Sequence, residues 1–520
     1  MQTQLKFFLF IIGLLFSLNI RGQAINLAVD LTEGEEGTFF DESNYDNGII
    51  GTIDNSIYMY AYNFDQSTYR IWSYDSENKT SRLLFQNSTV EDIRNFLIHD
   101  KRLYFVAEYE TLYVIENNTP AKIVFESDDY IKSLLVFRNE VHFINDDLLM
   151  KISDSGEVKE LYKFGFFGAS AMKELDNNLI IIGRDSNNDE QLFKSDGTTA
   201  GTLPYFPLNT GSSFRSDFNM TVVDNKLYFW YSLETNFVDL FVTDGTVIGT
   251  KNLKRFVAID FADFTGDKSI ISYKNKIYFR AETESDGDNM YVSDGTVGGT
   301  KLFYNPNSDG ADSRPKDMVV YKNKLYFSAV NSFWNPSLYV TDGSTPTKVF
   351  ADFKYSGLYL AEFNDSLYFQ GAKDDWNGEL FSSNGTSSGT KQISRESGEF
   401  SFSPYSLTSV NGLLFFIAEK EETGYELYYY DPKFSSSVNY TSLVDIQVFP
   451  NPAKETIKLL IDDSMINGIN GIEVHDIRGI VVLKVDNNLE NIDIRNLAKG
   501  VYTLSIMIEN NKYSKLFIKD

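Results

Sequence analysis

Five copies of one tetrapeptide contain the residues whose type and spacing could do chemistry. The copies read SDGT, TDGT, TDGS or SNGT, and their second residues are Asp196, Asp244, Asp294, Asp342 and Asn384. Carboxylates repeated in this way could bind calcium. One copy roughly every 40 to 50 residues, however, indicates a repeat architecture that would distribute them around the molecule. We therefore predict a structural turn in which Asp hydrogen-bonds its own backbone and Gly takes a left-handed conformation.

A second group of oxygen ligands lies in the run ESDGDN, which contains Glu284, Asp286 and Asp288. Calcium could bind there, although the run lacks the longer loop with a terminal Glu that defines an EF-hand. No other cofactor is predicted. The chain has no cysteine, which excludes disulfides, thiolate metal sites and cysteine nucleophiles, and none of its three histidines lies in an HExxH spacing.

Aromatic and acidic residues gather in the longer loops of the repeat. As ligand-binding candidates we single out Phe64, Phe333, Trp334, Asp374, Asp375 and Trp376. Exposed rings beside carboxylates suit a glycan or a peptide, through stacking and polar anchoring. The alternative is that these residues are solvated loop tips or pack between repeats. A glycosidase needs only two carboxylates, and the sequence does not identify such a pair among 73 acidic residues.

The elements that position these residues are short strands. Residues 316–353 hold four apolar runs, and the first two meet at Lys322 and Asn323, a junction typical of a tight hairpin. Each repeat is therefore predicted to be a four-stranded antiparallel meander. Such sheets bury both faces when they pack radially, so we predict an all-β protein whose main part is a β-propeller of nine blades, or of eight if a degenerate early repeat is miscounted. The short turns should share one face of the ring, and the longer loops the other.

The two ends of the repeat region predict how the ring closes. The ninth repeat stops near Asp431 after three strands, whereas Ala24 begins a segment that resembles the fourth strand of other repeats. An N-terminal strand that completes the last blade would remove two exposed sheet edges.

Charge and hydropathy divide the chain and limit its partners. The formal net charge is −26, so nucleic acid and anionic lipid are poor partners. Residues 1–22 read as a signal peptide, and no later segment is long and apolar enough to be a transmembrane segment. We place the propeller at 23–431, a Ser-rich linker at 432–443 and a different module, a small β-sandwich, at 444–520.

Two resemblances follow from these strings. The LYF signature followed by LYVSDGTVGGTK resembles the aspartate-glycine-threonine repeats of large secreted bacterial proteins predicted to be propellers, a family with no general activity. The last module has an F-P-N-P opening, a D-x-x-G turn, an L-x-x-G-x-Y segment and a basic final strand, and it resembles the C-terminal sorting domain of type IX secretion in Bacteroidota. The matching residues are Pro450, Asn451, Pro452, Asp476, Gly479, Gly500, Tyr502, Lys515 and Lys519.

The second resemblance implies a route and a partner. The signal peptide would bring the chain to the periplasm, and the type IX secretion machinery would use the last module as an address across the outer membrane. We expect a secreted or outer-surface propeller, released or attached, that binds a glycan or protein ligand, or serves adhesion, without catalysis. The rival expectation is a secreted carbohydrate-active hydrolase or lyase that uses paired carboxylates.

Overall fold

The structure is a computed structural model, and every regular element in the residues it describes is a β-strand. Contacts group the chain into one compact unit of Ile25–Asp431 and a second that contains Pro432–Asp520. None of the described residues forms a helix long and apolar enough to cross a membrane. The described residues are 25–31, 39, 48–63, 68–87, 92–153, 155–209, 220–234, 236–257, 270–350, 353, 359–372, 378–394, 402–420, 423–433, 447–449, 452–460, 469–476, 480–485, 492–508 and 511–520.

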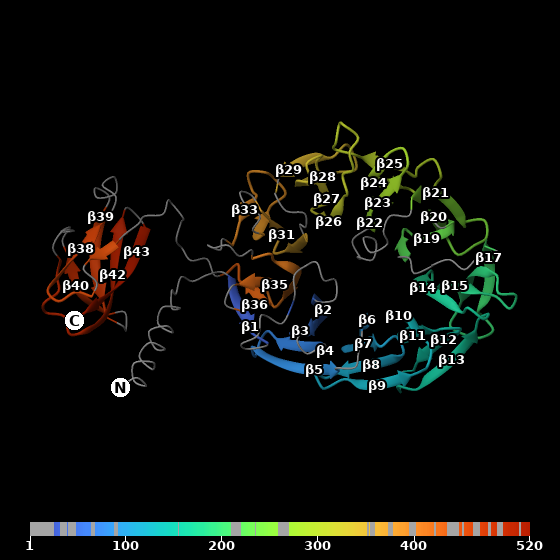
Figure 1. Cartoon of the computed structure of the whole chain (residues 1–520), viewed down its shortest axis with the longest axis horizontal. Helices are drawn as coiled ribbons and strands as arrows, with labels where there is room; N and C mark the ends of the chain where they lie inside the picture. The colour runs from blue at the N-terminus through green and yellow to red at the C-terminus, as the bar shows by residue number, and fades with distance from the viewer. Residues whose placement is uncertain are drawn as a thin grey trace. The chain divides into compact units, whose positions relative to one another are not determined.

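Nine four-stranded antiparallel sheets are described in the Ile25–Asp431 unit, and they are arranged in a ring (Figure 1). We number them as blades in chain order and give their strands from the centre of the ring outward. Blade 1 is β2 (Gly48–Ile53), β3 (Ser56–Asn63), β4 (Thr68–Asp75) and β5 (Thr80–Asn87). Blade 2 is β6 (Ile93–His99), β7 (Arg102–Ala107), β8 (Thr111–Glu116) and β9 (Lys122–Glu126). Blade 3 is β10 (Ile131–Phe137), β11 (Glu140–Asn145), β12 (Leu148–Ile152) and β13 (Val158–Lys163). Blade 4 is β14 (Ala169–Leu175), β15 (Asn178–Arg184), β16 (Glu190–Ser195) and β17 (Leu203–Asn209). Blade 5 is β18 (Met220–Val223), β19 (Lys226–Glu234), β20 (Phe237–Thr243) and β21 (Lys251–Val257).

The remaining four blades have the same order of strands. Blade 6 is β22 (Ile270–Tyr273), β23 (Lys276–Thr283), β24 (Gly287–Ser293) and β25 (Lys301–Tyr304). Blade 7 is β26 (Lys316–Tyr321), β27 (Lys324–Val330), β28 (Pro336–Thr341) and β29 (Thr347–Phe350). Blade 8 is β30 (Ala361–Phe363), β31 (Ser366–Gly371), β32 (Glu379–Ser383) and β33 (Lys391–Gln392). Blade 9 is β34 (Tyr405–Val410), β35 (Leu413–Lys420), β36 (Gly424–Tyr430) and β1 (Ile25–Val29). The predicted all-β propeller is confirmed, and the count of nine holds.

The last blade is completed by the beginning of the chain, as predicted. Strand β1 pairs antiparallel with β36, with Ile25 opposite Tyr430 and Leu27 opposite Tyr428. The resulting sheet has the order β1-β36-β35-β34. Joining the two ends of the repeat region in one sheet leaves fewer unpaired strand edges.

The two-residue hairpins have the conformation that the sequence indicates. Lys322 and Asn323 have φ values of 47° and 56°, and Asn411 and Gly412 have 51° and 74°. Positive φ at both central positions is the geometry whose twist matches that of the flanking strands. These hairpins set the register that buries the second strand of each blade.

The core lies between neighbouring blades, because each sheet is buried on both faces. In β27, Leu325 and Phe327 are completely buried, and they share one apolar cluster with Tyr278 of β23 and Met290 of β24 in the preceding blade. Burial of one such side chain stabilises the fold by about 1.5–3 kcal/mol. The residues of the LYF signature therefore form contacts between neighbouring blades.

The DGT turn is a small hydrogen-bonded unit, as its third copy shows at residues 293–300, between β24 and β25 of blade 6. Asp294 Oδ1 accepts hydrogen bonds from the Thr296 backbone N–H at 3.0 Å and from the Thr296 hydroxyl at 2.7 Å. The Thr296 hydroxyl oxygen in turn accepts the Gly299 N–H at 2.9 Å. Ser293 Oγ and Thr300 Oγ1 lie 2.7 Å apart and close the base of the turn. Equivalent bonds from Thr or Ser to the second residue occur at Asp196, Asp244, Asp342 and Asn384.

The turn also contacts the preceding blade. Gly385, at φ 91°, has no room for a side chain, because a Cβ there would lie 2.2 Å from Tyr326 Oη of blade 7. Lys274 Nζ donates to the Asp342 carbonyl at 2.7 Å, from blade 6 to blade 7. The two sequence signatures, LYF and DGT, thus meet across the boundary between blades.

The C-terminal unit has a three-stranded sheet, β37-β38-β41, and a four-stranded sheet, β40-β39-β42-β43, among its described residues. Both sheets contribute to one apolar core that includes Ile457, Val474 and Leu504. The strands are β37 (Gln447–Phe449), β38 (Thr456–Leu460), β39 (Ile469–His475), β40 (Val481–Val485), β41 (Ile492–Asp493), β42 (Gly500–Ile508) and β43 (Asn511–Lys519).

Candidate ligand-binding face

The two faces of the propeller carry different kinds of connection. The two-residue hairpins and the DGT turns end on one face, which we call the short-turn face. Because the strands are antiparallel, the connections from second to third strand and from one blade to the next emerge on the other, which we call the long-loop face. Binding groups on propeller-like scaffolds are best sought where loops vary, so the candidate residues are taken from the long-loop face.

Phe333 and Trp334 lie at the tip of the loop between β27 and β28. The Asn331 side chain holds this loop, since its Oδ1 accepts the backbone N–H of Phe333 at 2.9 Å and of Asn335 at 3.0 Å. Phe333 is 82% exposed and Trp334 is 60% exposed. Large rings on a loop that is already folded can contact a ligand at a small ordering cost.

A cation covers part of Trp334. The guanidinium carbon of Arg314 lies 4.2 Å from the centre of the Trp334 ring, within the range of cation–π attraction. Arg314 Nε also lies 4.0 Å from Asp288 Oδ2. The guanidinium is therefore held between a buried carboxylate and an exposed ring.

Arginine–aromatic pairs of this kind recur on the long-loop face. The guanidinium carbon lies 3.4 to 5.4 Å from the ring centre in the pairs Arg94–Tyr109, Arg184–Phe167 and Arg255–Phe237. Each of these arginines also lies within ion-pair distance of a carboxylate, which is Asp92, Glu190 or Asp239. Sequence reasoning missed the pattern because ring and cation come from different elements of the chain.

The other predicted ligand-binding residues cannot be placed. Phe64, Asp374, Asp375 and Trp376 lie outside the described residues. Their assignment stays a prediction.

Two residues of the acidic run at 284–288 form contacts within the fold. Asp288 is buried and forms a bidentate ion pair with Arg280, with Nε at 2.8 Å from Oδ1 and Nη2 at 2.5 Å from Oδ2. Glu284 is exposed, and Asp286 accepts a hydrogen bond from the Tyr291 hydroxyl at 3.2 Å. No cluster of three metal-ligating side chains occurs in the part of the chain that the structure describes. Calcium binding at this run stays untested.

Three buried carboxylates on third strands accept hydrogen bonds from the fourth strand of the same blade or from residues just after it. Asp239 Oδ1 accepts a hydrogen bond from Asn252 Nδ2 at 2.9 Å, and Glu426 Oε2 accepts the Leu31 N–H at 3.3 Å. Glu379 accepts a hydrogen bond from the Ser394 hydroxyl. These contacts give Asp239, Glu379 and Glu426 a structural role.

Glu282 and Glu190, both on the long-loop face, have raised pKa values, and burial is the main cause in each. Partial burial raises the pKa of Glu282, and the negative charges of Asp288 and Asp312 raise it further. Glu282 lies opposite Asp288 in the β23–β24 ladder. A carboxyl group with a raised pKa beside a second carboxyl group is the kind of pair that a glycosidase uses.

The histidines of the propeller are structural in their surroundings. His142 is buried against Phe137, with ring centres 5.5 Å apart, and burial lowers its pKa. His99 lies on the short-turn face, where its Nε2 is 3.1 Å from the Asn139 carbonyl oxygen.

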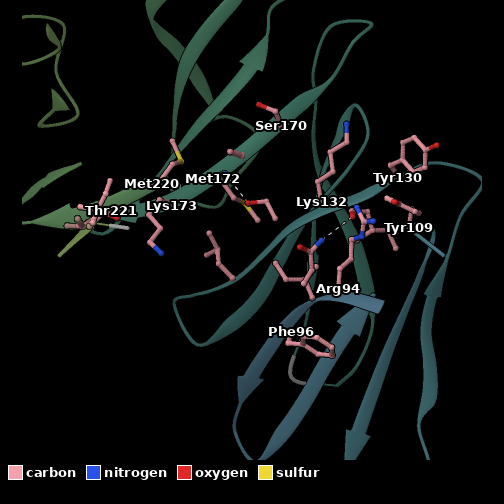
Figure 2. A pocket seen from close by; sticks show the side chains of 18 residues that line it. Arg94, Phe96, Tyr109, Tyr130, Lys132, Ser170, Met172, Lys173, Met220 and Thr221 are labelled. Atoms are coloured by element: carbon pink, nitrogen blue, oxygen red, sulfur yellow. Dashed lines mark hydrogen bonds between the residues drawn. The ribbon is translucent and has the colours of Figure 1, made fainter. Parts of the chain in front are cut away.

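A cavity of about 990 Å³ lies among the inner strands on the long-loop side of the ring (Figure 2). It is lined by the first residues of the inner strands of blades 2 to 6 and by two loop tyrosines, Tyr109 and Tyr130. Its charged lining residues are Arg94, Lys132 and Lys173, and none of its described lining residues is acidic. Sequence reasoning missed this site. A signal existed in the strings DIRNFLI and YIKSLLV, which place a basic residue second in two consecutive inner strands.

The described sorting-motif residues have clear local roles. The Tyr502 hydroxyl donates to the Ala498 carbonyl at 2.8 Å, which closes the turn around Gly500. Asp476 Oδ1 accepts the Ile480 N–H at 3.1 Å. Pro452 and Lys515 are exposed and Lys519 is buried, whereas Pro450, Asn451 and Gly479 lie outside the described residues.

Residues 447–520 match the family described as Secretion system C-terminal sorting domain, which supports the prediction of a type IX sorting module and of export. No curated protein matches the sequence.

Solved structures resemble the chain at low identity. BamB from Moraxella catarrhalis has a TM-score of 0.38 and 11% identity, covering 65% of this chain and 96% of its own. The β-propeller domain of the Trilobed protease from Pyrococcus furiosus has a TM-score of 0.31 and 12% identity, covering 65% and 92%. PorZ of Porphyromonas gingivalis, a surface component of the type-IX secretion system, has a TM-score of 0.21 and 11% identity, covering 90% and 80%. At these values we draw nothing about function from the resemblance.

Proposed function

We propose that this protein is exported by type IX secretion to the outer surface or the medium, where its propeller binds a glycan or protein through the long-loop face without catalysis. The match of residues 447–520 to a sorting domain supports the export step. The observation that carries the binding step is the loop that presents Phe333 and Trp334.

Three properties of this loop favour ligand contact. The rings are exposed, so burying them against a partner would release apolar surface from water. The loop is held by Asn331, so little order has to be gained on binding. Arg314 beside Trp334 adds a charged hydrogen-bond donor next to an aromatic face, a combination common at binding hot spots.

The test is a binding screen of the purified chain against immobilised polysaccharides and surface proteins, followed by affinity measurement for the best ligand. Trp334→Ala should weaken binding by about 1–3 kcal/mol, the range for loss of an aromatic anchor. Its melting temperature should change little, because the ring is exposed. Asp294→Ala, on the short-turn face, is the matched control and should leave affinity nearly intact. If Asp294→Ala abolishes binding in a stable protein while Trp334→Ala does not, the binding face is wrongly assigned.

A carbohydrate-active hydrolase or lyase is the second candidate, and the surroundings of Glu282 favour it. A carboxyl with a raised pKa lies opposite Asp288, and Arg314 links Asp288 to Trp334. The same polysaccharide panel should therefore be assayed for new reducing ends or unsaturated products. Turnover that disappears in Glu282→Gln would replace the binding proposal with this one. Retained binding with no product, in the wild type, would exclude it for that ligand.

A further inference from the structure

We propose that the cavity on the long-loop side of the ring is a second binding site, specific for the acidic group of an anionic saccharide, either a carboxylate or a sulfate. The site is distinct from the Phe333–Trp334 loop, because its lining comes from blades 2 to 6. The proposal therefore goes beyond the binding function proposed above.

The charge of the cavity is opposite to that of the chain. Formal net charge is −26, yet the charged side chains among the described lining residues are all basic. Lys173 is exposed, and no carboxylate among the described residues lies within ion-pair distance of it. In Figure 2 it lies across the cavity from Arg94, Tyr109 and Tyr130. Basic side chains on two sides of the lining attract an anion that enters the cavity.

The opposite wall is already organised. The guanidinium carbon of Arg94 lies 3.4 Å from the centre of the Tyr109 ring, and Asp92 forms an ion pair with Arg94. Lys132 Nζ lies 3.4 Å from Asp146 Oδ1. Neither carboxylate lines the cavity, so each holds a cation in place without filling the site. Fixed donors lose little side-chain entropy when an anion binds.

The uncharged lining indicates a saccharide rather than a bare anion. Tyr109 and Tyr130 form an edge-to-face pair with ring centres 5.3 Å apart, and both are exposed. Exposed aromatic faces stack on sugar rings, and their hydroxyl groups can hydrogen-bond sugar hydroxyls. Ser133 Oγ accepts the Met172 N–H at 3.0 Å, so its own hydrogen is available to a ligand. A volume of about 990 Å³ accommodates a short oligosaccharide.

The acidity of the whole chain argues against a polynucleotide in this site. A nucleic acid carries one charge per nucleotide along its length, and the phosphates outside the cavity would meet a strongly negative protein. A saccharide whose acidic group enters the cavity and whose neutral sugars remain outside avoids this repulsion.

The experiment measures the affinity of the full chain for three oligosaccharides of equal length: oligogalacturonate, sulfated dextran and unmodified dextran. We expect at least one of the two anionic probes to bind and unmodified dextran to bind at least tenfold more weakly. Affinity for the anionic probe should fall as salt rises from about 50 to about 300 mM, because screening shortens the reach of the lysine charges. The double variant Lys132→Gln/Lys173→Gln should weaken binding by about tenfold or more.

Lys301→Gln is the charge-matched control, since Lys301 is exposed and begins β25 on the short-turn face. It should bind as the wild type does. The single variant Lys173→Gln breaks no ion pair with any described residue, so it tests the site with little effect on folding. Equal loss in Lys301→Gln, equal binding of unmodified dextran, no binding of either anionic probe, or tighter binding of an oligothymidylate would each overturn the proposal. Trp334→Ala should leave this binding unchanged, so failure here is separable from failure of the Phe333–Trp334 site.

Discussion

Gly299 tests whether the repeated aspartates are structural. A Cβ at Gly299 would lie 2.0 Å from Asp294 Oδ1 and 2.3 Å from its Cγ, whereas a Cβ at the neighbouring Gly298 would have no atom within 4 Å. Neither glycine has a positive φ. Gly299→Ala and Gly298→Ala therefore make the same chemical change with and without a steric conflict.

The size of the effect follows from the hydrogen bonds of Asp294. To admit the methyl group, the carboxylate must leave the Thr296 N–H and hydroxyl, at 3.0 Å and 2.7 Å. The turn is exposed and water can replace these bonds, so their loss should cost about 1 kcal/mol. Each alanine also restricts the unfolded chain, which stabilises both variants by about 0.4–1 kcal/mol. Gly299→Ala should thus be less stable than Gly298→Ala by about 1 kcal/mol.

Asp294→Ala removes both the hydrogen bonds and the conflict. The double variant Asp294→Ala/Gly299→Ala should then be no less stable than Asp294→Ala alone, a clear departure from additivity. Urea unfolding can be followed by Trp230, which is buried in blade 5 with its ring centre 5.5 Å from that of Phe279 in blade 6. Equal stability of the two glycine variants, or simple addition of the two costs in the double variant, would refute the reasoning.

Three other measurements test the ring, its turns and its export. Deleting residues 24–31 should lower the melting temperature and broaden the transition out of proportion to its length, because β36 loses its partner β1; an unchanged transition would argue that β1 does not close the ring. The threonine hydroxyl bond lowers the pKa of Asp244 and of Asp294. The stabilising effect of these two carboxylates is therefore complete above the unfolded pKa and is lost as pH falls through the lower folded pKa, below about 4. Variants with Asn at both positions resemble the Asn384 turn. They should lose less stability than the wild type as pH falls through that range. Deleting 444–520 should leave a folded propeller in the periplasm, and its normal appearance in the medium would contradict the role of this segment as an address.

The fold could be predicted because its determinants are local and repeated. The hairpin at Lys322 and Asn323 and the four apolar runs around it specify one meander, and repetition of the pattern gives the number of blades. Closure could also be predicted, because the ninth repeat lacked a strand that the segment after Ala24 supplied. Each inference needed only neighbouring residues and a count.

The candidate sites were harder, because they depend on residues that only the ring brings together. Arg94 and Lys132 occupy the same place in consecutive inner strands, yet nothing local shows that both line one cavity with Lys173. The partner of Trp334 was hidden for the same reason, since Arg314 lies in the connection between blades. Phe333 and Trp334 were found from loop length and residue type alone, which predict exposure but not the cation beside the ring.

The two faces of the ring also differ in how the blades are connected, and this decides where sequence can change. On the short-turn face, Lys274 bonds to the Asp342 carbonyl and Tyr326 fits against Gly385, both across blade boundaries. A change in one of these turns therefore acts on two blades. In the Phe333–Trp334 loop, in contrast, the backbone N–H groups of Phe333, Trp334 and Asn335 donate hydrogen bonds to Asn331 of the same loop. Loops that are stabilised internally can change length and side chains without loosening the ring, so specificity for a ligand can vary on the long-loop face while the repeated turns maintain the scaffold.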